Sequence, residues 1–333
     1  MRFKFLLKKF FCAMSVATII FFQSPIIFAE ESANEKLIQI EQDTYGTEQI
    51  GAILTRISKL EKDYTGKNMQ GNMNARIDAI YNLLYENTGE ASVIAKVNAL
   101  EWNISHEVKS GGIDNRIFLL EDSILGKTES GTFFSRIRQL SKESFGAENI
   151  PMQEEQIPEN VLIKVSLTED VGSKTLQIGD TVNFKVAEDV IIDDKLIFAK
   201  GLRGEGTVKN VRKASGWLAR KGRVEIDFNK IRCLDGRTIE TFVGEEAKKI
   251  MTENKMVAGA LLVGMDLNSD WNKFIGAGRN IEISDGTEFY IQTKNSSAVY
   301  VLPIGGDTLT VTEDIAPIEE KKSSEPDEVF KAD

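Results

Sequence analysis

The sequence predicts an α+β protein whose two structural classes lie in separate domains: an N-terminal antiparallel α-helical repeat of six 20-residue units and a C-terminal β-barrel or sandwich-like domain. Three observations predict this. The first half carries a gap-free internal repeat, a polar segment bounded by prolines follows it, and the hydrophobic period then changes from helical spacing to strict alternation. A length of 333 residues suits two modest domains.

The repeat aligns in steps of 20 residues from residue 36. Each copy has a basic residue followed by aliphatic residues one and four positions later. Within one copy Ile53, Ile57, Leu60 and Tyr64 share one face of an amphipathic helix, and glycines bracket the turns, so each copy is predicted to be one helix. The basic column consists of Lys36, Arg56, Arg76, Lys96, Arg116 and Arg136.

A glutamate stands five positions after the basic residue in four helices: Glu41, Glu61, Glu101 and Glu121. A helix of about 14 residues is about 21 Å long, whereas a five-residue loop reaches at most about 17 Å, so successive helices are expected to run antiparallel. Residues five apart do not face each other on one helix, so we expect Arg-to-Glu pairs between neighbouring helices. The alternative is that the basic column binds a carboxylate or sugar polymer.

Prolines at 151 and 158 enclose a polar stretch that predicts a linker over 150–160. Beyond it Val182, Phe184 and Val186 alternate with polar residues, as do Val224, Ile226 and Phe228, which predicts half-buried strands. Residues 245–263 have helical character, and 281–302 predict a last hairpin. The expected domains are a signal peptide at 1–29, the helical repeat at 30–149, the linker, a β-rich barrel-like domain at 161–316 and a disordered acidic tail at 317–333.

The N-terminus predicts export to the periplasm or cell envelope. Arg2, Lys4, Lys8 and Lys9 precede an apolar run over 10–22, and a small residue, Ala29, marks the expected cleavage site. Loss of these four basic residues changes the formal charge from -10 to -14, which excludes nucleic acid as a partner. No later apolar run approaches about 20 residues, so we expect no integral membrane protein after cleavage.

Two segments, 195–206 (Lys-Leu-Ile-Phe-Ala-Lys-Gly-Leu-Arg-Gly-Glu-Gly) and 222–238, resemble the β-barrel of conjugation-type (type IV) secretion scaffold proteins. They match in the lysine-glycine corner, the "Gly-Arg-Val" strand and the closing Asp-Gly turn, while Ala199 and Leu234 replace prolines of the family. The resemblance implies a barrel-type fold and an envelope role. The phrase Arg-Ile-x-x-Leu-Glu over 36–146 likewise resembles 20-residue helical repeats of exported bacterial envelope proteins.

Catalytic chemistry finds little support in the residue types present. His106 is the only histidine and is expected in a surface turn, so a zinc site or a His-based nucleophilic site lacks ligands or a base. Cys12 leaves with the signal and Cys233 remains alone, which excludes an intramolecular disulfide. Asp266, Asn268 and Asp270 begin like a calcium loop, but Trp271 stands where a glycine is required. We expect no catalytic residues, no cofactor and no metal.

One basic stretch stands out in an acidic chain. Between two expected barrel strands lie four basic residues and a tryptophan, with no acidic residue among them: Arg212, Lys213, Trp217, Arg220 and Lys221. They form either a solvated hairpin tip or a contact surface for an anionic cell-wall polymer, a lipid headgroup or an acidic protein.

We therefore expect a non-catalytic exported envelope protein, structural or scaffolding, that binds an envelope protein or peptidoglycan or another anionic cell-wall polymer. Oligomerisation is left open. The alternatives are a cell-wall glycan hydrolase that uses paired carboxylates and a component of a secretion assembly, which would assemble into rings.

Overall fold

The computed structural model describes residues 32–215, 220–265 and 279–304. The expected signal peptide and acidic tail, and the residues resembling a calcium loop, lie outside the described residues. The described chain from Ala33 onward belongs to one compact unit. None of its helices combines the length and apolar character needed to cross a bilayer.

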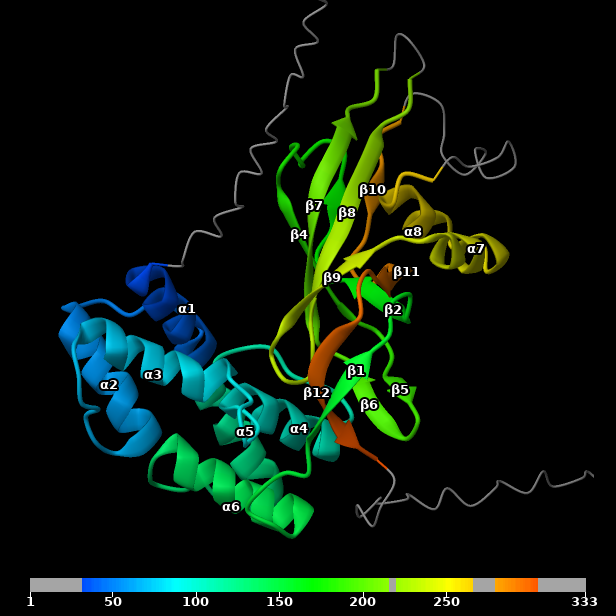
Figure 1. Cartoon of the computed structure of the whole chain (residues 1–333). Coiled ribbons are helices and arrows are strands. Elements are labelled where there is room, and N and C mark those ends of the chain that lie inside the picture. Colours follow the sequence, from blue (N-terminus) through cyan, green and yellow to red (C-terminus); the bar gives the residue numbers. More distant parts are fainter. Residues whose placement is uncertain (1–31, 216–219, 266–278, 305–333) are drawn as a thin grey trace, which may run out of the picture. The chain divides into compact units, whose positions relative to one another are not determined.

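Six helices of 13 residues each follow the 20-residue repeat (Figure 1). The side chains of Asn72, Ser92 and Thr132 cap three of them by accepting a hydrogen bond from the backbone N–H three residues later. His106 ends one helix with a left-handed backbone, φ 48°, at a position where other copies use glycine. The helices are α1 (Ala33–Tyr45), α2 (Ile53–Thr65), α3 (Met73–Tyr85), α4 (Val93–Ser105), α5 (Ile113–Leu125) and α6 (Phe133–Phe145).

The expected Arg-to-Glu pairs between consecutive helices are present. In each, the arginine lies 15 positions after the glutamate and binds both of its carboxylate oxygens with Nε and Nη2. Where Tyr81 replaces the glutamate, Lys96 instead binds Glu90 at 3.0 Å. The pairs are Arg56–Glu41, Arg76–Glu61, Arg116–Glu101 and Arg136–Glu121.

The helices do not pack simply in chain order. Helix α1 lies against α3 and α5, and α2 lies against α6. At the second contact the Tyr64 ring meets Phe133 edge to face, with centroids 5.1 Å apart. The repeat is thereby closed around one shared apolar core instead of being extended as a row.

The C-terminal half contains a closed antiparallel barrel, as the alternating pattern predicts (Figure 1). Going round the barrel, the strands are β11 (Glu288–Thr293), β2 (Leu162–Leu167), β4 (Thr181–Val186), β7 (Arg203–Arg212), β8 (Arg223–Arg232) and β9 (Thr238–Phe242). Closure occurs where Gln292 of β11 pairs with Phe242 of β9. A barrel leaves no free sheet edge among these strands.

The barrel interior is filled by three aromatic rings. Phe228 and Phe289 lie with centroids 4.2 Å apart, and Phe184 meets both nearly edge on. Gly204 makes room for them, because a Cβ there would lie 2.1 Å from the Phe184 ring. The glycines of β7 therefore serve the packing of the barrel core.

The segment expected as a linker, 150–160, contains a strand. Strand β1 (Gln153–Ile157) pairs antiparallel with β12 (Ser297–Pro303), and Gln153 opposes Val301. Two further strands, β6 (Lys195–Phe198) and β5 (Val190–Ile192), complete this sheet in the order β1-β12-β6-β5. The glutamates and glutamines of β1 are compatible with a strand because most of their side chains are exposed and β12 supplies the backbone pairing.

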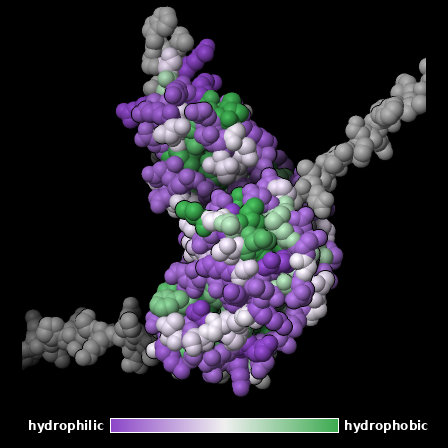
Figure 2. Space-filling view, turned by 90° about the vertical axis from the view of Figure 1, so that its left-hand side faces the viewer, coloured by the Kyte–Doolittle hydropathy of each residue, from purple (hydrophilic) through white to green (hydrophobic). Residues whose placement is uncertain are grey.

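Smaller elements complete the fold. Helices α7 (Glu245–Glu253) and α8 (Val257–Leu262) occupy the stretch expected to be helical and pack on β11. A short pair joins β3 (Val171–Gly172) to β10 (Glu282–Ile283). Figure 2 shows that hydrophilic side chains cover most of one face of the molecule, with hydrophobic side chains scattered between them.

Buried polar contacts join the repeat to the β-rich half. The Asn98 side chain donates to the Leu234 carbonyl at 2.8 Å, and Trp102 Nε1 donates to Asp189 Oδ2 at 2.8 Å. Val108 N donates to the Lys200 carbonyl. A Cβ on the next residue, Gly201, would lie 2.1 Å from the Val108 oxygen, so these two segments of the chain touch backbone to backbone.

Candidate functional site

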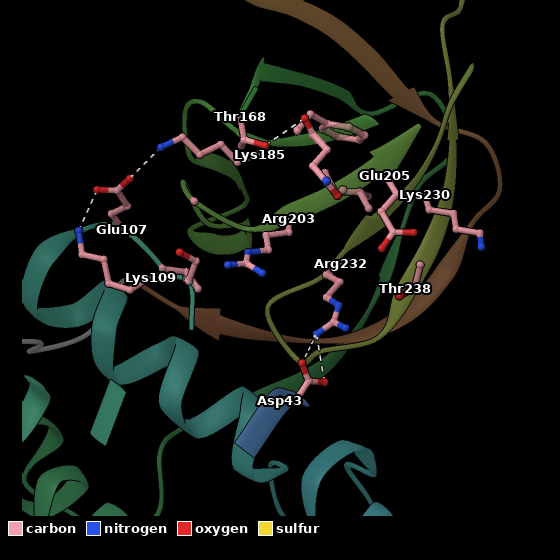
Figure 3. Close-up of a pocket in the computed structure, with 17 residues that line it drawn as sticks. Asp43, Glu107, Lys109, Thr168, Lys185, Arg203, Glu205, Lys230, Arg232 and Thr238 are labelled. Carbon is pink, nitrogen blue, oxygen red and sulfur yellow. Dashed lines mark hydrogen bonds and ion pairs between the residues drawn. The ribbon is translucent and has the colours of Figure 1, made fainter. Parts of the chain in front are cut away.

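A pocket of about 860 Å³ opens where the α4–α5 loop faces strands β4, β7 and β8 (Figure 3). The loop contributes residues 107–110, α1 contributes Asp43, and the barrel strands contribute the opposite wall. This volume lies within the usual range of small-ligand pockets. The pocket is therefore the place where the two halves of the chain together could hold a ligand.

Positive charge dominates the pocket. Five basic residues line it, against three acidic ones, Asp43, Glu107 and Glu205, which leaves a formal excess of two positive charges in a chain of net charge -10. The basic residues are Lys109, Lys185, Arg203, Lys230 and Arg232. An anion entering the pocket would meet a field opposite in sign to that of the chain as a whole.

Glu107 bridges two of the pocket lysines. Lys109 Nζ lies 2.9 Å from one carboxylate oxygen and Lys185 Nζ lies 3.6 Å from the other (Figure 3). The hydrogen bond from Lys109 lowers the pKa of the Glu107 carboxyl below its ordinary value, with the charge of Lys185 acting in the same direction. Glu107 is therefore a charged partner of these lysines at neutral pH.

Asp43 of α1 anchors the opposite side. Arg232 Nη1 lies 3.4 Å from both of its carboxylate oxygens, and the Tyr85 hydroxyl donates to Oδ2 at 2.7 Å. Burial, followed by the charge of Asp43, raises the pKa of the Tyr85 hydroxyl far above its ordinary value. The Tyr85 hydroxyl thus remains a hydrogen-bond donor to Asp43.

Arg203 lies between these groups without a side-chain partner in the described part of the chain. Figure 3 shows it projecting into the pocket with no interaction drawn to it. Partial burial lowers the pKa of its guanidinium, the positive charges of Arg232 and Arg116 lower it further, and the negative charge of Asp43 acts in the opposite direction. The sheet keeps this unfavourable arrangement in place, because Arg203 directly opposes Lys185 in the β4–β7 register.

The basic hairpin predicted from the sequence lies elsewhere. Strands β7 and β8 extend from the pocket towards it, and nine residue steps separate Arg203 from Arg212, about 30 Å along a strand. Arg212 donates to the Lys221 carbonyl at 3.4 Å, and Ser215 pairs with Arg220. Lys213 and Arg220 are exposed. The structure thus brings Arg212, Lys213, Arg220 and Lys221 onto one hairpin, while Trp217 lies outside the described residues.

The other residues singled out by the sequence lie in packing contacts, ion pairs or turns outside the pocket's basic cluster. The four arginines of the repeat column bind the glutamates named above. His106 is exposed in a turn, as expected, and its ring meets Trp102 edge on. Cys233 is buried and free, and burial raises the pKa of its thiol well above the ordinary value. Within the described ranges, no three His, Cys, Asp or Glu side chains are grouped so that they could hold a metal ion.

Comparisons with known proteins give little further guidance. No protein-family model and no curated protein matches the sequence. Among solved structures, ComB10 of the Com Type IV secretion system of Helicobacter pylori is similar at 18% identity, over 42% of this chain and 88% of that chain, with a TM-score of 0.24. This neighbour comes from the secretion class that the sequence resembles, but the likeness is weak and assigns no family.

Sequence reasoning missed the pocket. Its charged residues come from separate stretches near positions 43, 107, 185, 203 and 232, and the repeat pattern carries no information on how a helix docks on a barrel. One local sign was available: Arg203 falls at an exposed position of an alternating strand that follows a glycine corner.

Proposed function

We propose that this chain is a non-catalytic exported protein of the bacterial cell envelope, structural or scaffolding, which acts by binding a partner or an anionic cell-wall polymer. The observation that carries the proposal is the pocket where the repeat meets the barrel, with its excess of positive charge inside an acidic chain. A site of this kind attracts and orients anionic groups.

The state of the acidic residues favours binding over glycan hydrolysis. Glycosidases need a carboxyl group whose pKa is raised so that it acts as the acid. In the pocket, Glu107 has a lowered pKa, and Arg232 and Tyr85 bind Asp43. The pKa of Asp235 is raised, chiefly by burial, but this side chain is fully buried and accepts hydrogen bonds from the backbone N–H groups of Arg237 and Tyr300.

Export is proposed from the N-terminal sequence, with its basic residues, apolar run and small residue at position 29. The envelope assignment is supported by this feature and by the resemblance to secretion-scaffold barrels.

The test is a co-sedimentation assay with intact peptidoglycan sacculi. The purified chain is incubated with sacculi, these are pelleted, and both the retained protein and the released muropeptides are measured. We expect retention without release. Release of muropeptides would overturn the non-catalytic assignment, and retention no greater than that of an unrelated acidic protein would overturn cell-wall binding.

The same assay tests the basic hairpin. Alanine at Arg212, Lys213, Trp217, Arg220 and Lys221 together should reduce retention if the hairpin contacts the polymer. Unchanged retention would remove the hairpin from the binding surface and leave the pocket as the candidate.

A further inference from the structure

The basic residues of the pocket form a row across the barrel sheet. Lys185 of β4 directly opposes Arg203 of β7, and Gly204 opposes Ile231, which places Arg203 beside Arg232 at the end of β8. Like charges on adjacent strands repel one another and lower stability. These three basic residues lie side by side on the solvent-accessible wall of the pocket.

The outer members of this row have partners and the central one does not. Glu107 lies 3.6 Å from Lys185, and Asp43 lies 3.4 Å from Arg232. Arg203, between them, has no side-chain hydrogen bond or ion pair with the described residues. Its planar guanidinium presents parallel N–H donors of the kind that bind a carboxylate with two hydrogen bonds.

The repeat shows how this chain satisfies its other arginines. Arg116 Nε and Nη2 bind the two oxygens of Glu101 at 2.8 and 2.6 Å, and three further pairs repeat the arrangement. In each of them the chain supplies the carboxylate. At Arg203 the described chain supplies no such carboxylate, and the guanidinium faces the pocket.

We propose that Arg203 binds a carboxylate of an acidic peptide segment that enters this pocket. The excess of two positive charges suits a segment with two carboxylates. The Thr238 hydroxyl group, which also lines the pocket, can bond to the peptide backbone, whereas Thr168 and Asn183 already donate to the Asn183 carbonyl and to Glu169.

Neighbouring like charges that repel one another in the absence of ligand are typical of a site that binds an opposite charge. Local arrangements that lower stability persist where a ligand compensates for them. A peptide carboxylate would neutralise Arg203 and relieve its repulsion by Arg232. The inference rests on the proposed binding function and specifies its ligand chemistry.

The test is titration calorimetry of the full chain in about 50 mM salt, where electrostatic attraction is only partly screened. The probes are the capped peptide Gly-Glu-Glu-Gly, its counterpart Gly-Gln-Gln-Gly and inorganic phosphate. We expect binding of the glutamate peptide alone. Arg203→Gln should weaken it at least tenfold, whereas Lys249→Gln, at an exposed position of α7 outside the pocket lining, should leave it unchanged.

Thermal melting of the variants distinguishes a binding role from a structural one. Without ligand, Arg203→Gln should melt at the same temperature as the parent chain or higher, because the substitution removes repulsion and breaks no pair. A lower melting temperature, equal binding of the glutamate and glutamine peptides, or full affinity in Arg203→Gln would overturn the inference. Binding of phosphate in place of the peptide would overturn the peptide as ligand and identify a general oxyanion site. Loss of peptide binding with intact retention on sacculi would count against this pocket and leave the proposed function standing.

Discussion

Glu101 and Arg116 form a buried ion pair that also holds the pocket loop in place. Arg116 donates two hydrogen bonds to the Glu101 carboxylate, and the same carboxylate accepts the backbone N–H of Lys109 at 2.8 Å. Glu41 and Glu121 accept the corresponding N–H groups of Gln49 and Glu129. Three of the four column glutamates therefore pair neighbouring helices and also fix the loop between them, and in the fourth copy that loop lines the pocket.

Removal of the Glu101 charge should strongly destabilise the chain. In Glu101→Gln, Arg116 remains buried without its countercharge, and loss of one partner of a buried pair typically costs about 3–5 kcal/mol. The free energy of unfolding, measured by urea titration, should fall by an amount of that order.

Two control variants test whether the loss of stability comes from the unpaired buried charge of Arg116. Lys249→Ala breaks a 3.9 Å pair with Glu253 on the exposed side of α7 and should leave the urea midpoint nearly unchanged. The double variant Glu101→Gln/Arg116→Met removes both charges and should recover much of the lost stability. A single variant as stable as the parent chain would show that the pair contributes little to folding.

Gly204 should not tolerate even a methyl group. In Gly204→Ala the added Cβ would stand 2.1 Å from the Phe184 ring and 2.7 Å from the Lys230 carbonyl oxygen. Such overpacking of a core costs about 1–3 kcal/mol or more. We expect a lower thermal midpoint by calorimetry. Gly172→Ala is the matched control, since its Cβ would meet atoms no closer than 3.4 Å, and equal midpoints for the two variants would contradict the packing argument.

The residues that were predictable from the sequence are those whose partners recur at a fixed spacing. Arg136 and Glu121 lie in columns, so their pairing follows from the repeat itself. Alternation likewise predicts the barrel strands, because half-buried strands expose every second residue. Strand β1 was missed because Gln153 and Glu155 carry no alternating pattern and owe their conformation to β12. The surroundings of Arg203 were missed for a similar reason, since α1 and β8 approach it only in the folded chain.

Cys233 should be chemically protected in the folded protein. Its side chain is fully buried, and burial raises the pKa of the thiol, so the reactive thiolate is disfavoured. A thiol-specific chromogenic disulfide reagent at pH 8 should not react with native protein of residues 30–333 but should react fully with its one thiol in concentrated urea. Rapid labelling without denaturant would show that the loop between β8 and β9 opens readily.

Alkaline pH should destabilise the fold through the fully buried Tyr64 and the half-buried Tyr45 and Tyr85. Burial, as the leading cause, raises the pKa of Tyr45, Tyr64 and Tyr85 in the folded chain above the unfolded value of about 10. The folded state therefore retains protons that the unfolded state releases. Stability is fully present below about pH 10 and falls above it, by about 1.4 kcal/mol per pH unit for each such tyrosine.

The dependence of the unfolding free energy on pH identifies the tyrosines responsible. Urea midpoints at pH 7, 9 and 11 should show a steep loss only in the last interval, and Tyr64→Phe should make that loss smaller. At pH 7 the same variant loses the hydrogen bond between Tyr64 and Thr44, a cost of about 1 kcal/mol. Tyr290→Phe, at a half-buried position of β11, is the matched control. If Tyr64→Phe and the parent chain lose stability in parallel above pH 10, Tyr64 ionises in the folded state and its burial does not control the alkaline transition.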